Sequence, residues 1–130
     1  PFREGKGFVK VESGLFEGSY SAGSRFENGK GTNPEELIGA AHAGCFSMAL
    51  ALALGLKKTP PRMIETTAEV TIEPVGQGFK ITSSALHTVA DVPGISEEDF
   101  LKAADDAKAN CPVSQALAGV KISLNAKLKR

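Results

Sequence analysis

One long apolar helix, predicted over residues 34–54, constrains this sequence more than any other feature. Asn33 suits the N-cap position, Pro34 suits the first helical position, and Gly55 suits the stop after the last turn. No charged residue lies between Leu37 and Leu56. A helix that is apolar on every face has to be buried on every face, so the remaining chain must be arranged around it.

Two surroundings could bury such a helix: a lipid bilayer or a protein core. About 20 apolar residues can span a bilayer, but Gly39, His42 and Gly44 dilute the run, and no Lys or Arg lies close to its N-terminal end. A core, not a membrane, is therefore favoured. A chain of 130 residues has little material to cover the helix alone. Because Ala40, Ala43 and the two glycines are small, we predict a homodimer in which two copies of the helix pack together inside sheets.

The composition narrows the class of protein. The chain has 15 basic and 15 acidic residues and a formal net charge of zero, which argues against binding to nucleic acid or a membrane surface through bulk charge. Its length predicts a single domain, residues 1–130. No signal-peptide pattern is present at the start, so we expect a cytoplasmic, reducing environment. A bond between Cys45 and Cys111 would then be catalytic or redox-sensing rather than structural.

The other elements are shorter. Alternating apolar and polar residues predict strands, two of which form an N-terminal hairpin, and capping and proline signals predict two further helices. Residues 22–32, rich in Gly and Ser, are expected to form a loop. The order β-β-α-β-β-α-α-β favours an α+β fold with largely antiparallel sheet. The expected strands are residues 6–12, 15–21, 64–74, 79–89 and 120–128, and the expected helices follow Ser96 and begin at Pro112.

Two cysteines carry the possible chemistry. Cys45 lies in the middle of the apolar helix, where burial raises a thiol pKa and usually leaves the group inert. Cys111 precedes Pro112 at a predicted helix start, so local reasoning makes it the more acidic thiol, unless it is merely a small apolar residue there. A reactive Cys45 would need a cation, and Arg25 of the same or a partner chain is a candidate. Glu35 could hold the Arg25 guanidinium in place, although the two residues could equally be a solvated charge and a helix-dipole partner.

His42 is three residues before Cys45 and therefore on the same helix face. Three interpretations stay open. The first is a Cys–His pair for nucleophilic catalysis. The second is a zinc site formed with Cys45, Cys111 and His87, although these spacings match no compact zinc motif. The third, which is favoured, is a hydrogen-bonded core histidine.

Residues 31–50, together with Cys111-Pro112-Val113-Ser114-Gln115, closely resemble the osmotically inducible protein C / organic hydroperoxide resistance (OsmC/Ohr) family. The resemblance extends over nearly the whole chain, and Glu36-Leu37-Ile38-Gly39-Ala40-Ala41-His42 is similar to the OsmC branch. It implies an OsmC-like α+β fold: an intertwined homodimer with antiparallel sheets wrapped around two long central helices.

The same resemblance implies a thiol peroxidase that reduces organic hydroperoxides, with an antioxidant role in the stress response. By the family pattern Cys45 is the peroxidatic cysteine and Cys111 the resolving cysteine. Arg25 matches the arginine that stabilises the thiolate, and Glu35 matches the carboxylate that orients this arginine. The family pattern thus reverses the local ranking of the two thiols.

The hypothesis is that Cys45 becomes a sulfenic acid, forms a disulfide with Cys111, and is reduced by an external dithiol. Family precedent points to lipoyl groups as that dithiol, and no metal or bound cofactor is expected. A redox-sensing or binding protein that uses the same disulfide as a switch is the main alternative, and a hydrolase using Cys45 and His42 is a weaker one. Candidates for an apolar substrate wall, each of which could equally be core, are Phe26, Phe46, Met48 and Phe79.

Overall fold

The computed structural model describes residues 4–129 and divides the chain into two compact units. The first unit ends at Ile38 and the second begins at Gly39. The long helix α2 (Pro34–Leu56) begins in the first unit and continues in the second, close to the predicted bounds. The expectation of a single domain stays a prediction.

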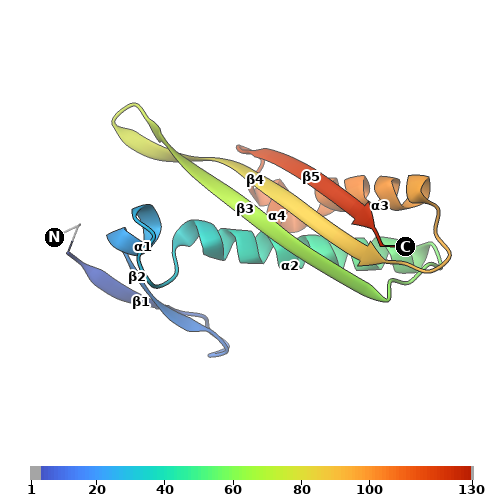
Figure 1. The fold of residues 1–130 in the computed structure, drawn as a ribbon, viewed down its shortest axis with the longest axis horizontal. Coiled ribbons are helices and arrows are strands. Elements are labelled where there is room, and N and C mark those ends of the chain that lie inside the picture. Colours follow the sequence, from blue (N-terminus) through green and yellow to red (C-terminus); the bar gives the residue numbers. More distant parts are fainter. Residues whose placement is uncertain (1–3, 130) are drawn as a thin grey trace. The chain divides into compact units, whose positions relative to one another are not determined.

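The first unit contains the predicted hairpin, formed by β1 (Lys6–Lys10) and β2 (Glu17–Ser21) in antiparallel register (Figure 1). The predicted loop after it is partly wrong, because Ala22–Phe26 form a short helix, α1. Its first turn is held by a reciprocal capping box. The Ser21 hydroxyl accepts a hydrogen bond from the Ser24 amide at 3.1 Å, and the Ser24 hydroxyl accepts one from the Ser21 amide at 2.8 Å. Capping therefore overrides the loop-like composition.

Polar contacts join α1 to the beginning of α2. The Ser24 hydroxyl donates to the Thr32 carbonyl oxygen at 2.8 Å, and the Asn33 side-chain amide donates to the Ser24 carbonyl oxygen at 3.1 Å. The Asn33 side-chain oxygen accepts from the Glu36 amide at 2.7 Å, which confirms Asn33 as the N-cap. These bonds fix α1 against the first turn of α2, within the first unit.

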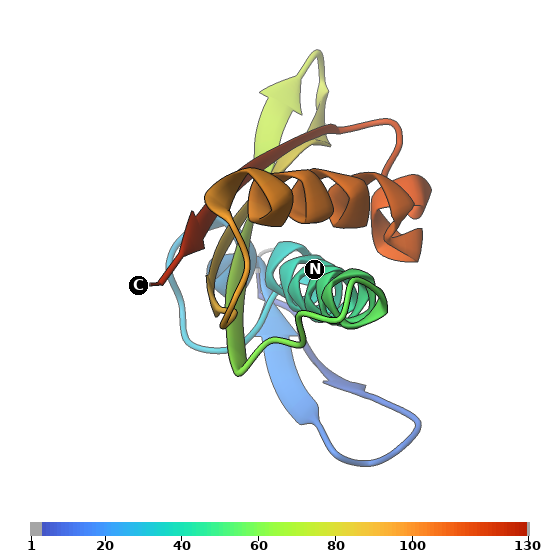
Figure 2. The same cartoon turned by 90° about the vertical axis from the view of Figure 1, so that its right-hand side faces the viewer.

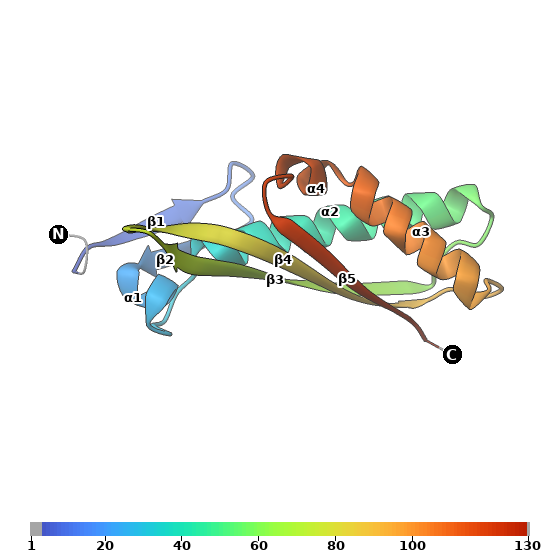
Figure 3. The ribbon, with the colours of Figure 1, turned by 90° about the horizontal axis from the view of Figure 1, so that it is seen from above.

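The second unit is a three-stranded sheet with helices on one face (Figures 2 and 3). The strand order is β3 (Met63–Val75), β4 (Gly78–Asp91) and β5 (Lys121–Leu128). The covering helices are α2, α3 (Glu97–Asn110) and α4 (Pro112–Ala116). Strands and helices thus occur in the predicted order, apart from the additional α1.

One strand pairing differs from the expectation of largely antiparallel sheet. β3 and β4 are antiparallel, with a register shift between Thr71 and Ile72, whereas β4 and β5 are parallel. The connection over residues 92–120 carries α3 and α4 across the sheet, and a helical crossover of this kind returns the chain parallel to the preceding strand.

Only part of the surface of α2 is covered. Phe46, Leu50 and Leu54 are fully buried in the core formed with α3 and the sheet. On another side, Met48 and Leu52 keep 76% and 65% of their surface exposed. By length and composition α2 could cross a membrane, and 28% of its most apolar window is buried. Burial on every face, which the sequence demands, is therefore not reached within one chain.

Gly39 allows α2 to approach β3 closely. A Cβ atom at this position would lie 2.7 Å from the carbonyl oxygen of Ala68, too close for any side chain. The carbonyl belongs to a paired strand and cannot move away easily. This glycine therefore serves contact within the chain rather than contact with a second helix.

Candidate active site

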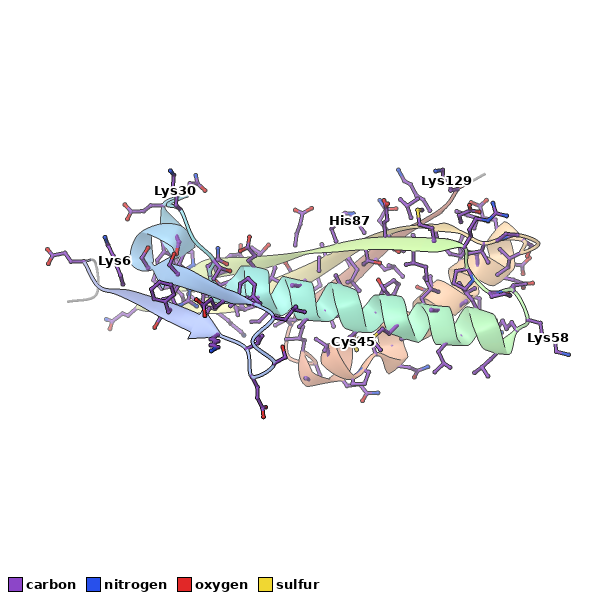
Figure 4. All side chains as sticks on the ribbon, turned by 90° about the horizontal axis from the view of Figure 1, so that it is seen from below. Lys6, Lys30, Cys45, Lys58, His87 and Lys129 are labelled. Carbon is purple, nitrogen blue, oxygen red and sulfur yellow. The ribbon has the colours of Figure 1, made fainter. Side chains whose placement is uncertain are left out.

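The structure brings Cys45 and Cys111 together. Cys45 is half-buried on α2, and Cys111 is fully buried between α3 and α4. Both are free thiols, and they lie within hydrogen-bonding reach of each other. Figure 4 shows Cys45 on the side of α2 that faces α3 and α4. Two thiols that interact in this way are candidates for a disulfide bond.

The turn between α3 and α4 aims backbone donors at both sulfurs. Cys111 ends α3, where its amide donates to the Ala107 carbonyl oxygen at 2.9 Å, and it is also the N-cap of α4. Pro112 at the first position of α4 has no amide hydrogen. The Val113 amide lies near both sulfurs and the Ser114 amide near the Cys111 sulfur, where each acts to lower a thiol pKa, although Cys111 makes no side-chain cap hydrogen bond to α4. Amides that a helix start leaves free thus face the thiols.

The two thiols are shifted in opposite directions. Burial raises the pKa of Cys45, and its hydrogen bond with Cys111 acts in the same direction. At Cys111 burial also acts to raise the pKa, but hydrogen bonds from Cys45, Ser114 and Val113 outweigh it and leave the pKa lowered. Local reasoning from the sequence predicted this ranking. Ionisation of Cys45 therefore needs a positive charge from outside this group of contacts.

Arg25 and Glu35 form the predicted ion pair in the first unit. The Arg25 Nε and Nη2 atoms donate to the two Glu35 carboxylate oxygens at 3.0 and 2.9 Å. Glu35 is 6% exposed, and the guanidinium also lies 5.4 Å from the centre of the Phe26 ring. The bidentate geometry holds the guanidinium in one orientation. The pairing is confirmed, whereas the action of Arg25 on Cys45 stays a prediction.

His42 is a hydrogen-bonded core residue, as favoured. It is fully buried, with Nδ1 2.7 Å from the Ser84 hydroxyl and Nε2 2.8 Å from the Ser114 hydroxyl. Burial lowers the pKa of His42, so the ring is neutral near pH 7. Because both ring nitrogens are engaged by serines, His42 offers neither a base for Cys45 nor a nitrogen for zinc.

The zinc interpretation lacks His87 as well. Among residues 4–129, no group of three or more His, Cys, Asp or Glu side chains could hold a metal ion. His87 lies on the sheet, away from Cys45, with Nε2 3.4 Å from a Glu69 carboxylate oxygen (Figure 4). The sheet holds His87 apart from Cys45, so the four residues that the zinc interpretation combined do not meet.

An apolar groove runs beside Cys45. Its volume is about 1030 Å³, and α2 lines it from Ala40 to Leu56, opposite residues of α3 and Pro112. Of the four candidate wall residues, only Met48 lines this groove with Cys45. Phe26 lines a separate pocket of about 360 Å³ with Arg25 in the first unit.

Two of the four candidate wall residues take other places in the structure. Phe46 is fully buried, because it points from α2 into the hydrophobic core. Phe79 is 60% exposed near the β3–β4 turn and does not line the groove. Sequence alternation cannot show which apolar residue faces a groove, and these two assignments are not supported.

The sequence reasoning missed both serines that hold His42. Ser114 had a usable signal, since it is three residues after Cys111 and shares the first turn of α4 with it. Ser84 had none, because it belongs to a strand far from His42 in the sequence.

Comparison with known proteins identifies the family. The sequence model described as OsmC-like protein matches residues 27–125. The chain belongs to the OsmC-like protein family. Its relatives include the Peroxiredoxin OsmC of Escherichia coli, which is 51% identical over 128 residues, 98% of this chain and 89% of that protein. The Organic hydroperoxide resistance protein-like 1 of Staphylococcus saprophyticus is 36% identical over 99 residues, 74% of this chain and 69% of that protein.

Solved structures of OsmC and Ohr proteins share the fold. The organic hydroperoxide resistance protein OsmC of Legionella pneumophila superposes with a TM-score of 0.79 at 27% identity, over 93% of this chain and 88% of that one. An organic hydroperoxide resistance protein of Elizabethkingia anophelis gives 0.76 at 26% identity, over 96% and 95%. The predicted OsmC-like α+β class is therefore confirmed.

Proposed function

We propose that this protein is a cysteine-based peroxidase that reduces organic hydroperoxides to alcohols. The contact between the Cys45 and Cys111 thiols, at the edge of an apolar groove, carries the proposal. Relatives named peroxiredoxin and organic hydroperoxide resistance protein support it.

The chemistry has three balanced steps. The Cys45 thiolate attacks one peroxide oxygen, the O–O bond breaks, and the alkoxide leaves and takes up a proton as the alcohol; sulfur loses two electrons and becomes a sulfenic acid. The Cys111 thiolate then attacks the Cys45 sulfur, an S–S bond forms, and the departing hydroxide takes up a proton to give water. An external dithiol, which we propose carries a lipoyl group, reduces the disulfide by two exchange steps and is itself oxidised.

Arg25 is proposed as the cation that ionises Cys45. Burial raises the pKa of Cys45, so its thiolate requires a compensating charge. The Arg25 guanidinium is fixed by Glu35 and lines a pocket with Phe26. It acts on the thiol of its own chain or on that of a partner.

The functional unit is proposed to be a cytoplasmic homodimer in which the two single-domain chains are intertwined. The exposed apolar side of α2, which includes Met48, Leu52 and Leu56, is the surface that a second copy covers. Pairing of two such helices would supply the burial that one chain leaves incomplete.

The deciding experiment titrates free thiols before and after addition of cumene hydroperoxide. Both thiols of each chain should be lost. Cys45→Ser should abolish peroxide consumption, whereas Cys111→Ser should consume one equivalent and stop at a sulfenic acid that dimedone traps. A Cys45→Ser variant with full activity would end the proposal. A redox switch without turnover would consume a single equivalent even when a dithiol is supplied.

A further inference from the structure

A row of buried hydrogen bonds leads from the sheet to the Cys111 sulfur. The Ser84 hydroxyl on β4 lies 2.7 Å from Nδ1 of His42 on α2. Nε2 of the same ring lies 2.8 Å from the Ser114 hydroxyl on α4. Ser114 is three residues after Cys111, in the first turn of α4, and its side chain interacts with the Cys111 thiol. Ser84, His42 and Cys111 are fully buried, and Ser114 is 6% exposed. Peroxide reduction at Cys45 does not use this row.

The direction of the hydrogen bonds follows from the tautomer of His42. A neutral imidazole has one donor nitrogen and one acceptor nitrogen, and each serine hydroxyl has a single hydrogen. If Ser84 donates to Nδ1, then Nε2–H donates to the Ser114 oxygen, and the Ser114 hydrogen is free to point at Cys111. In the opposite direction Ser114 would donate to His42 and could only accept from the Cys111 thiol.

We propose that His42 is a positioning residue that aims the Ser114 hydroxyl at the Cys111 sulfur and thereby stabilises the Cys111 thiolate. A hydroxyl donating to an anionic sulfur forms a stronger bond than one between neutral groups. The inference deepens the proposed function, on which its catalytic meaning rests, because the thiolate it stabilises is the one that attacks the Cys45 sulfenic acid. The relay itself carries no net charge, so it favours the thiolate without burying a second ion.

The direct test measures the Cys111 pKa in a Cys45→Ser background, where Cys111 is the only thiol of the chain. The ultraviolet absorbance of the thiolate is followed against pH, so no reagent has to enter the buried site. Adding Ser114→Ala should raise the Cys111 pKa by about one unit, which is about a tenfold smaller thiolate fraction below the pKa. Adding His42→Gln instead should shift it in the same direction and provides a second variant if the first does not fold.

Matched controls separate positioning from general loss of structure. Ser114→Thr keeps the hydroxyl and should retain the parent pKa. Ser47→Ala removes another α2-to-sheet hydrogen bond, from Ser47 to the Thr66 hydroxyl at 2.7 Å, and should leave the pKa unchanged. An unchanged Cys111 pKa in Ser114→Ala overturns the proposal, and a lowered one shows that the row runs in the opposite direction, which also overturns it.

A kinetic readout connects the relay to the reaction. In the chain with both cysteines, Ser114→Ala should slow formation of the disulfide from the sulfenic acid about threefold, because the tenfold smaller thiolate fraction is partly offset by the greater nucleophilicity of the more basic thiolate. The first peroxide step should keep its parental rate. Equal slowing of both steps would contradict the assignment to Cys111. If no peroxide is consumed at all, the proposed function fails, whereas the Cys111 titration still decides the relay.

Discussion

Arg25 is held by both oxygens of a nearly buried carboxylate, so its guanidinium can be aimed at another group. We expect Arg25→Met to lower peroxidase activity at pH 7 by at least about tenfold, because the Cys45 pKa rises by one unit or more when the cation is lost. The activity should recover as the pH is raised toward the new pKa. The measurement is the initial rate of cumene hydroperoxide reduction against pH.

The control for Arg25 is Arg62→Met. Arg62 also pairs with a carboxylate, Asp91 at 3.4 Å, but its side chain is 71% exposed and it belongs to no proposed site. Its pH profile should match that of the parent. A parental profile in Arg25→Met as well would remove Arg25 from the mechanism.

His42 predicts a pH dependence of stability. Burial lowers its folded-state pKa below the ordinary value of 6.5, so the unfolded chain binds the proton first. The stability that the neutral ring contributes is present above pH 6.5 and is lost as the pH falls through 6.5 toward the folded-state pKa. The midpoint of thermal unfolding should therefore fall over this range. His42→Gln should weaken the dependence, whereas His87→Gln, on the sheet surface, should preserve it.

For individual residues, the sequence predicted the ion pair between Arg25 and Glu35, which lies in the first turn of α2. Local reasoning about Cys111 at a helix start predicted the lowered Cys111 pKa, whereas the family pattern assigns the reactive thiolate to Cys45, which stays a prediction. The sequence could not find the partners of His42, because a buried histidine requires hydrogen bonds without indicating which distant strand or turn supplies them. Nor could it tell Phe46, which fills the core, from Met48, which lines the groove.

Among the elements, the packing of α2 on β3 depends on Gly39. Gly39→Ala should lower the free energy of unfolding by about 1–3 kcal/mol, because the new Cβ would press on the Ala68 carbonyl oxygen. Chemical denaturation measures the change. Gly55→Ala, in the same helix with nothing within 4 Å of the added atom, should instead stabilise the chain by up to about 1 kcal/mol. Equal effects at both positions would contradict this explanation.

Long elements with regular apolar spacing were predicted close to their observed bounds. α1 was missed because its Gly- and Ser-containing sequence resembles a loop, and only the Ser21–Ser24 capping box reveals it. The parallel pairing of β5 was missed because grouped strands and helices suggested antiparallel sheet, although two helices between β4 and β5 form a crossover.

At the scale of the whole molecule, the exposed side of α2 predicts self-association. Leu52→Glu should convert the proposed dimer to monomers in sedimentation equilibrium, because it places a charge in an apolar contact. Val75→Glu, at another exposed apolar position on β3, should leave the measured mass unchanged. A dimeric Leu52→Glu variant would show that the second copy docks elsewhere.

The uncovered apolar side of α2 also has a consequence for the newly made protein. If a second copy buries this apolar surface, each folded chain must meet another before the surface associates with other hydrophobic surfaces or with chaperones. Assembly then obeys mass action, and the yield of working protein should rise more steeply than the amount synthesised when the protein is scarce. For the same total amount of protein made, a short period of rapid synthesis would therefore give more assembled protein than slow, continuous synthesis.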